Sequence, residues 1–318
     1  MSRRTVTSPL HRCAGALLRT SPGRALLARA PALRGVGIAL LWHRIRPRGA
    51  RDTDVIPTVP RDLLRRQLEA LLEVGEIVPL SELERHDPQD GPRFALTFDD
   101  DDAGHAQHAL PVLTELGLPA TFFLSGRWLH GLGPYWWEVL ESSARRDGVD
   151  ELARQLGHPG CSTIELAAAI EGTPQAARLA TIGNQGSRDG LMSGQEAQAL
   201  AEHGMEIGFH TVDHPVLTEL DPQATRDAVS RGRRALATQL GTDIERFAYP
   251  HGRADARTRT AVRHAGFVSA WTTSHRPVRT SDDVTARGRW EPGPREPESL
   301  LVGAVRRLLL RMETRSIR

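Results

Sequence analysis

Short apolar runs alternate along the chain with longer segments whose apolar residues recur at helical spacing. From residue 35 onward this alternation is typical of parallel strands joined by crossover helices. The apolar runs predict strands at 36–42, 94–98, 119–124, 205–209, 246–249 and 267–272. The periodic segments predict helices at 60–73, 107–116, 195–203, 222–240 and 255–265. The pattern therefore indicates an α/β fold.

Each predicted helix is followed within two residues by a glycine, as Gly117 follows 107–116 and Gly204 follows 195–203. Glycine at this position readily adopts the left-handed conformation that closes the last helical turn. The regular recurrence of a glycine after each predicted helix favours a β/α barrel. Residues 125–194 break the rhythm, and we interpret them as an excursion that shapes a substrate groove.

The ends of the chain differ in charge from its middle. Residues 1–50 carry ten arginines and no acid, and residues 301–318 carry five arginines and one acid, so the formal charge of +2 leaves the middle near −12. We therefore expect a catalytic domain at 35–300 between a basic, flexible segment at 1–34 and a basic tail at 301–318. An acidic middle excludes nucleic acid as the expected partner, because phosphate recognition needs a basic face.

The basic segment at 1–34 allows two interpretations. Leu10, Ala14 and Leu17 at helical spacing fit a basic amphipathic helix in peripheral contact with a membrane. The prolines of the segment favour a disordered tail instead. The longest apolar run, at 35–42, has eight residues, which is too short for a membrane span. A signal-peptide cleavage site does not follow it. We expect a cytoplasmic or membrane-peripheral protein rather than a secreted one.

An apolar strand ends abruptly in four carboxylates at Asp99, Asp100, Asp101 and Asp102. Such a run is often only a solvated acidic loop. Carboxylates at the carboxyl end of a parallel barrel strand, however, point into the usual active-site mouth. Adjacent Asp99 and Asp100 could therefore divide two tasks, one binding a metal ion and the other accepting a proton.

A second predicted strand ends in His210 and His214, which are four residues apart. If the segment turns helically, this spacing places both imidazoles on one face, where they can bind one metal ion. Two surface histidines are the alternative. With a carboxylate they form a ligand set that leaves coordination positions open, and its oxygen and nitrogen donors suit zinc or a similar divalent ion.

A third strand leads into the turn Pro250-His251-Gly252, whose amide at His251 could face a developing oxyanion.

These segments, in this order, resemble the signature motifs of the polysaccharide deacetylases of carbohydrate esterase family 4, the NodB-homology domain. The similarity runs through 97–100, 108–113, 117–123, 210–214 and 249–252, and the opening at 41–45 also resembles the family. The resemblance covers about residues 36–290. It implies a distorted (β/α) barrel and metal-assisted removal of acetyl groups from N-acetylhexosamine units of a polysaccharide, oligosaccharide or glycolipid.

The resemblance also implies roles for individual residues. Asp99 would be the general base, and Asp100, His210 and His214 would bind the metal ion, most consistently Zn²⁺, with Co²⁺, Mn²⁺ and Ni²⁺ as alternatives. The backbone amide of His251 would bind the oxyanion. Tyr249 and Pro250 would border the N-acetylated glycan.

Three departures from the family pattern bear on turnover. Asp101 replaces the usual glycine and adds negative charge near the metal site, and Ala248 replaces an arginine that commonly steadies the base. Ala270 stands where an aspartate usually precedes Trp271, so both members of an arginine–aspartate pair are absent. This paired loss is typical of a subgroup difference rather than of inactivity.

The Leu-x-His motif that supplies the catalytic acid in many members has no counterpart after Trp271. His275 is the histidine that remains downstream, and we take it as the candidate acid. His43 and His105 are alternative groups at the mouth, each more typical of a surface or supporting histidine.

Trp136 and Trp137 in the excursion could stack on a sugar or could pack over the barrel. Two rival functions remain open. One is a glycan-binding protein that has lost turnover, and the other is a hydrolase of a different amide or acyl bond, because the ligand set alone specifies only metal-assisted hydrolysis.

Overall fold

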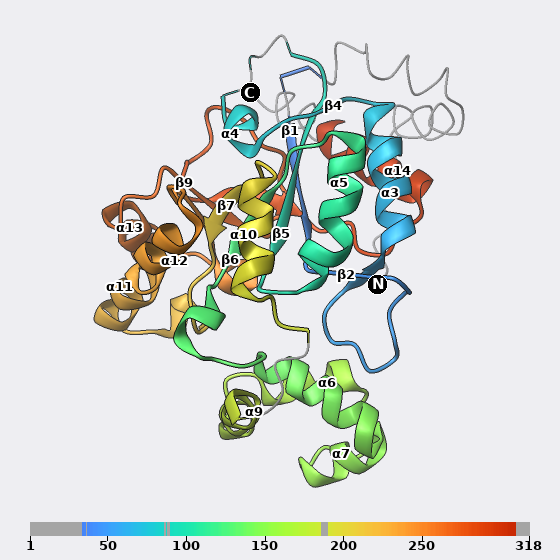
Figure 1. Cartoon of the computed structure of the whole chain (residues 1–318), viewed down its shortest axis with the longest axis vertical. Helices are drawn as coiled ribbons and strands as arrows, with labels where there is room; N and C mark the ends of the chain where they lie inside the picture. Colours follow the sequence, from blue (N-terminus) through green and yellow to red (C-terminus); the bar gives the residue numbers. More distant parts are fainter. Residues whose placement is uncertain (1–33, 36, 86, 88–89, 186–189, 310–318) are drawn as a thin grey trace, which may run out of the picture.

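The computed structural model describes residues 34–35, 37–85, 87, 90–185 and 190–309. Over these ranges seven parallel strands close into a barrel (Figure 1). In order around the barrel they are β1 (Gly37–Trp42), β5 (Arg93–Asp99), β6 (Thr121–Leu124), β7 (Glu206–Phe209), β8 (Arg246–Ala248), β9 (Ser269–Thr272) and β10 (Arg287–Trp290). The barrel closes because β1 pairs with β5 on one side and with β10 on the other. The expected (β/α) barrel is confirmed.

All six strands expected from the apolar runs are present, with ends within two residues of those predicted. Their residues alternate between two environments, as strand geometry requires. Ala39, Ala95 and Phe123 belong to the cluster that fills the barrel, whereas Ile38 and Leu96 belong to the larger cluster beneath the helices. Because both faces are buried, these strands read as continuous apolar runs.

Strand β10 is not predicted by hydrophobicity, because its sequence is Arg-Gly-Arg-Trp. Arg287 and Arg289 are nevertheless buried, with exposed fractions of 3% and 0%. Three shorter strands accompany the barrel: β4 (Glu76–Ile77) beside β5, and the pair β2 (Arg44–Arg46) and β3 (Thr58–Pro60).

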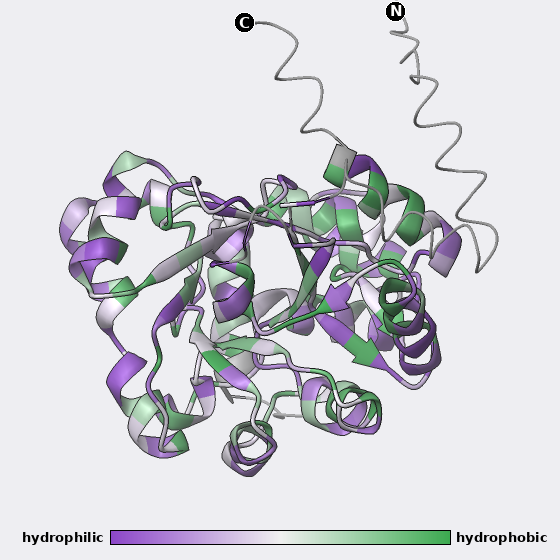
Figure 2. Ribbon diagram, turned by 90° about the horizontal axis from the view of Figure 1, so that it is seen from above, coloured by the Kyte–Doolittle hydropathy of each residue, from purple (hydrophilic) through white to green (hydrophobic). Residues whose placement is uncertain are grey.

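The helices that surround the barrel alternate between hydrophobic and hydrophilic residues (Figure 2). They are α3 (Arg61–Leu72), α4 (Leu80–Leu83), η2 (His105–Ala109), α5 (Leu110–Leu116), α10 (Gly194–Glu202), α11 (Pro222–Ser230), α12 (Arg233–Leu240), α13 (Ala256–His264) and α14 (Pro297–Leu309). The single helix expected at 222–240 is two helices. The chain breaks at Gly232, whose φ of 89° favours glycine and whose missing side chain leaves room for Val212.

The expected boundary at residue 300 is wrong, because α14 runs through it. Leu301, Val305 and Leu308 recur at helical spacing and are buried, and α14 lies beside α3 in Figure 1. Arg307 covers the Trp290 ring at 3.8 Å from its centroid. The predicted basic tail therefore contributes a helix to the domain as far as residue 309, and the remainder of the tail lies outside the described residues.

The excursion between β6 and α10 builds a helical layer with a core of its own. It contains η3 (Arg127–His130), α6 (Trp136–Asp147), α7 (Val149–Gln155), α8 (Thr163–Ile170) and α9 (Pro174–Gln185). Leu140, Leu152 and Leu166 pack in this core, which is separate from the two barrel clusters. Figure 1 shows α6, α7 and α9 projecting beyond one end of the barrel.

The basic segment expected at 1–34, with its amphipathic pattern, lies outside the described residues apart from Arg34. Across the described ranges, no helix has the length and apolar character needed to cross a membrane.

Candidate active site

A cavity of about 370 Å³ opens at the carboxyl ends of the barrel strands. Its barrel side is formed by His43, Asp99, Asp100, His210, His214 and His251. Its opposite side is formed by Val55, Ile56, Trp136, Trp137, Ile164 and Ala168. The strand ends thus bring together the acidic and histidine motifs that are separated by more than a hundred residues in the sequence.

Asp100, His210 and His214 bring one oxygen and two nitrogens together, all within 4.8 Å of one another. Asp100 Oδ1 lies 3.7 Å from His210 Nε2 and 3.6 Å from His214 Nε2. His210 Nδ1 donates to the carbonyl oxygen of Ala248 at 2.8 Å, which leaves a lone pair on Nε2. Asp100 Oδ1 is buried and has no hydrogen-bond partner among the described residues. An orphaned carboxylate oxygen beside two imidazoles fits a divalent cation.

Burial controls the protonation of these three groups. It lowers the pKa of His210 to about 4, with Asp99 opposing the shift, and it lowers the pKa of His214 well below the usual value. Both imidazoles are therefore neutral at pH 7, as metal ligands must be. Burial raises the pKa of Asp100 to about 7, with His43 opposing the shift and Asp99 adding to it. A bound cation would favour the ionised carboxylate.

The two histidines converge through a loop, and the helical turn considered from their spacing is not formed. Residues 210–214 are not helical, and Thr211 and His214 have φ values of 61° and 51°. Asp100, on the facing strand end, has φ of 73°. Non-glycine residues in this region cost about 1–3 kcal/mol each and persist where the surrounding structure holds them. Two of the three residues of the cluster, Asp100 and His214, are thus held in a conformation that the surrounding structure must stabilise.

Asp99 lies beside the cluster and is held by an arginine, which the sequence comparison did not anticipate. Arg289 on β10 donates two hydrogen bonds of 2.6 Å to the two carboxylate oxygens of Asp99. Burial alone would raise the pKa of Asp99, but the Arg289 charge and hydrogen bonds, aided by His210, lower it. Ala248 indeed offers no guanidinium to Asp99, and an arginine from β10 pairs with Asp99 instead.

His43 is the histidine that faces the cluster, and His275 is not. His275 is exposed on the loop after β9 and does not line the cavity. His43 lines it, and its Nδ1 lies 2.8 Å from Glu291 Oε1. Burial disfavours the charged imidazole, but Glu291, with smaller contributions from Asp100 and Asp99, outweighs it and raises the pKa of His43 to about 9. A pKa of about 9 favours the protonated imidazole at pH 7.

His105, the other alternative at the mouth, is fully buried and supports His43 from below. Its Nε2 donates to the carbonyl oxygen of His43 at 2.9 Å, and its ring packs against Phe98 and Phe122. It therefore fixes the backbone at His43 without reaching the cavity.

Residues 86–270 match the polysaccharide deacetylase family. The match spans more than half of the chain. The chain belongs to this family. It is therefore a carbohydrate deacetylase, and its closed parallel barrel agrees with that assignment.

Solved structures support the fold of the deacetylase. The Streptococcus pyogenes deacetylase PplD in complex with acetate is 18% identical with a TM-score of 0.59, over 84% of this chain and 96% of that chain. IcaB from Ammonifex degensii is 22% identical with a TM-score of 0.56, over 85% and 96%. The de-N-acetylase from Aggregatibacter actinomycetemcomitans is 14% identical with a TM-score of 0.56, over 80% and 95%. No curated protein matched the sequence.

In this deacetylase the four consecutive carboxylates point to four different partners. Asp101 adds negative charge that helps to raise the pKa of Asp100, as expected, and its carboxylate accepts backbone N–H bonds from Ser125 at 2.8 Å and from Arg127 at 2.8 Å. Asp102 accepts two hydrogen bonds, of 2.5 and 2.6 Å, from Arg46. The acidic run is therefore neither a solvated loop nor a single charge cluster.

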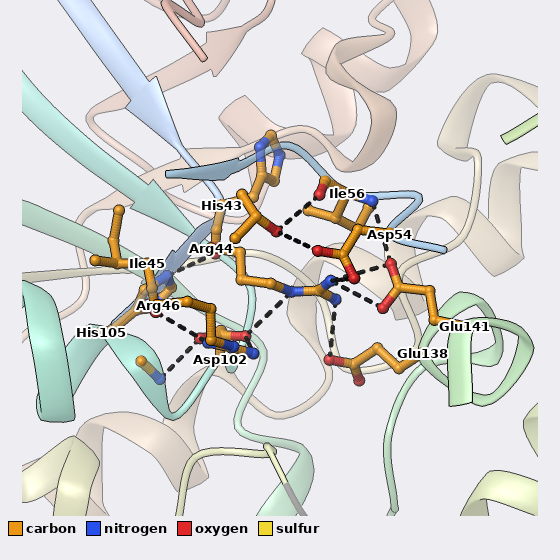
Figure 3. A network of polar contacts seen from close by, with 12 residues as sticks. His43, Arg44, Ile45, Arg46, Asp54, Ile56, Asp102, His105, Glu138 and Glu141 are labelled. Atoms are coloured by element: carbon orange, nitrogen blue, oxygen red, sulfur yellow. Dashed lines mark hydrogen bonds and ion pairs between the residues drawn. The ribbon is translucent and has the colours of Figure 1, made fainter. Parts of the chain in front are cut away.

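Asp102 also belongs to a buried ionic network that joins the barrel of the deacetylase to the excursion (Figure 3). Arg44, 5% exposed, lies between Asp102 at 3.6 Å and Glu141 of α6 at 2.8 Å. Glu141 in turn accepts the backbone N–H groups of Val55 and Ile56, at 2.7 and 3.3 Å. The network fixes the loop between β2 and β3 beside the cavity.

The tryptophans of the deacetylase have separate positions. Trp137 is buried, stacks on Tyr135 with centroids 4.4 Å apart, and meets the His214 ring edge-on at 5.0 Å. It therefore packs behind a metal-ligand candidate. Trp136 is half-buried at the cavity wall, where its ring can contact a substrate.

The turn after β8 contributes unequally to the cavity. His251 has φ of 57° and pairs through Nδ1 with Glu171 of the excursion at 2.9 Å. Tyr249 borders the cavity, but its hydroxyl donates to the carbonyl oxygen of Thr285 at 2.9 Å. Pro250 is buried and is not among the lining residues described. Of these three, His251 is the residue whose side chain helps to close the site.

Sequence reasoning missed Arg289 and Glu291 and placed too little weight on His43. A signal existed for His43, because it directly follows the buried strand β1 just as Asp99 ends β5. No comparable signal marks Arg289, because a four-residue strand with two arginines looks like a polar loop.

Proposed function

We propose that this deacetylase removes N-acetyl groups from N-acetylhexosamine units with the help of a divalent metal ion, most consistently Zn²⁺. The observation that carries the proposal is the convergence of three elements on one cavity: the Asp100–His210–His214 cluster, an ionised Asp99, and a protonated His43. A metal ion bound by the cluster would polarise the acetyl carbonyl and acidify water. The remaining steps fall to side chains of the chain itself.

Asp99 acts as the general base in this proposal. Its carboxylate lies 3.8 Å from His210 Nε2 and is kept ionised by Arg289. It takes a proton from the water that attacks the acetyl carbonyl carbon. The oxyanion that forms on the carbonyl oxygen is stabilised by the backbone N–H of His251, as the family resemblance implies.

His43 completes the reaction as the general acid. When the carbon–nitrogen bond breaks, the departing nitrogen takes the proton of His43, and Glu291 stabilises the charged imidazole before the transfer. The products are acetate and a free amine on the sugar, and both side chains regain their starting protonation from water. This assignment supplies the acid that had been sought at His275.

The rival in which turnover has been lost rested on the charge of Asp101 and on the absent Leu-x-His motif. Asp101 adds charge that raises the pKa of Asp100, but its carboxylate is occupied by backbone N–H groups, and His43 faces the cavity as an alternative acid. These contacts favour an active enzyme over a binding protein without activity.

The test measures bound metal and acetate release in the same samples. We expect Asp99→Asn to retain metal and lose about 10²–10⁴-fold in acetate release from N-acetylated chitooligosaccharides, whereas His210→Ala loses both. Asp213→Asn is the matched control, because Asp213 stands between the two histidines in sequence but pairs with Arg231 at the surface. Undiminished release by both Asp99→Asn and His210→Ala would refute the proposed centre.

A further inference from the structure

The helix α8 presents two apolar faces, which is unusual for a helix at the edge of a domain. Leu166 and Ile170 belong to the core of the excursion. Ile164 and Ala168 are four residues apart on another side, and they line the active-site cavity together with Glu171, which directly follows the helix. Ile164 is 58% exposed. A water-facing helix side normally carries polar residues, so this apolar side indicates a partner that enters the cavity.

The wall beside α8 is apolar as well. Val55 and Ile56 line the cavity, and their backbone N–H groups are held by the buried Glu141. Trp136 and Val55 both pack against the core of the excursion. The apolar surface is therefore held in place before any ligand arrives, and contact with it costs little conformational entropy.

Hydrogen-bonding groups are concentrated at the other end of the cavity. Among the described residues that line the excursion side of the cavity, the charged side chain is Glu171. Its carboxylate is already paired with His251. A sugar ring that entered this side would place hydroxyl groups against Ile164 and Ala168, and a hydroxyl buried without a partner is unfavourable. An alkyl chain would meet the same wall without this penalty and would displace water from it.

We infer that the substrate of this deacetylase is an N-acetylated sugar joined to an apolar chain, and that α8 with Val55 and Ile56 binds that chain. This inference rests on the proposed function, because the acetamido group must lie at the Asp100–His210–His214 cluster for the chain to reach α8. The cavity is continuous from the cluster to this wall, so one amphipathic molecule can occupy both ends.

The experiment compares methyl, butyl and octyl glycosides of N-acetylglucosamine, below their micelle-forming concentrations, with N,N′,N″,N‴-tetraacetylchitotetraose. Acetate release is measured with metal-loaded protein. We expect kcat/KM to rise with chain length, by about tenfold or more from methyl to octyl, since each buried methylene contributes several-fold. We expect the tetrasaccharide to be a poorer substrate than the octyl glycoside.

The variant Ile164→Ser should flatten the chain-length series, because it should lower kcat/KM for the octyl glycoside much more than for the methyl glycoside. Ile182→Ser is the matched control, since Ile182 is an exposed isoleucine of the excursion outside this cavity. Octyl glucoside, which has no acetyl group, should inhibit the wild type competitively and inhibit Ile164→Ser more weakly. This binding readout does not depend on turnover of the ligand.

Two failures are distinguishable. Acetate release that is independent of chain length, or highest with the tetrasaccharide, would overturn the apolar-chain inference and leave the proposed function standing. Absence of release from every N-acetylated sugar by metal-loaded protein would overturn both.

Discussion

Substitution of Arg289 by methionine isolates the contribution of the buried pair with Asp99. Arg289 is fully buried, and two of its nitrogens lie 2.6 Å from the two oxygens of Asp99. Removing one partner of a buried ion pair costs roughly 3–5 kcal/mol, because the other charge stays buried and uncompensated. We expect the free energy of unfolding of Arg289→Met to fall by this amount in urea denaturation without added metal.

The substitution should also change the pH dependence of stability. The pKa of Asp99 is lowered in the folded protein, since Arg289 outweighs the opposing effect of burial. A carboxyl with a lowered folded pKa contributes stability that is present above its unfolded pKa and lost as the pH falls through the folded pKa. The difference between wild type and Arg289→Met should therefore be largest near neutral pH and should shrink in acid.

The rate of acetate release tests whether Arg289 also supports Asp99 in catalysis. Without Arg289 the pKa of Asp99 rises, so the acidic limb of the rate profile should move to higher pH and the rate at neutral pH should fall. Arg253→Met is the control, because Arg253 is exposed and pairs with Glu219 at the surface. Its stability should stay within about 0.5 kcal/mol of wild type.

A double variant gives the decisive comparison. Asp99→Asn combined with Arg289→Met removes both charges. The free energy of unfolding should therefore fall by less in the double variant than the sum of the decreases in the two single variants. The reasoning is refuted if Arg289→Met retains wild-type stability and rate, or if the two single losses simply add.

Three further perturbations test other contacts of the site. Glu291→Gln removes the main support of the His43 imidazolium, whose pKa is about 9, so the alkaline limb of acetate release should move roughly one to two units lower; an unmoved limb would exclude His43 as the acid. Trp137→Ala removes the ring against His214 and should weaken metal binding about 10–100-fold by titration. Trp128→Phe is the control, because Trp128 lies in η3 and is not among the residues that line the cavity, and it should leave metal binding unchanged. Asp101→Asn weakens the acceptor of the N–H groups at 125–127 and should lower the free energy of unfolding by about 1–3 kcal/mol, with metal content unchanged; loss of the metal would instead implicate Asp101 in the cluster.

The sequence predicted those parts of the fold that hydrophobicity encodes. Strands such as β1 are buried on both faces and therefore appear as apolar runs, and Asp99 and His210 stand out because they follow such runs directly. The approach failed where burial is achieved by ion pairing. Arg289 is as buried as any core residue, yet its burial depends on Asp99, which is 190 positions away in the sequence.

Local spacing was equally ambiguous at the metal-ligand candidates. The spacing of His210 and His214 allowed either a helical turn or two separate surface histidines. The two rings meet through residues with left-handed backbone conformation, which the spacing of apolar residues does not predict. The segment at 301–318 was predicted to be a tail from its basic charge, although Leu301, Val305 and Leu308 recur at helical spacing and are buried in α14. In each case the missing information was the identity of a distant packing partner.

The closure of the barrel by β1 and β10 has a consequence for the protein during synthesis. Arg289 and Glu291, which pair with the proposed base and the proposed acid, enter the chain after every other residue of the proposed reaction centre. A ribosome-bound chain that ends before β10 would carry Asp99, the three ligand candidates and His43, but no counter-charge for either proton-transfer group. If the proposed roles hold, hydrolytic activity arises only when β10 docks against β1, and shorter nascent chains of this protein should not hydrolyse substrate.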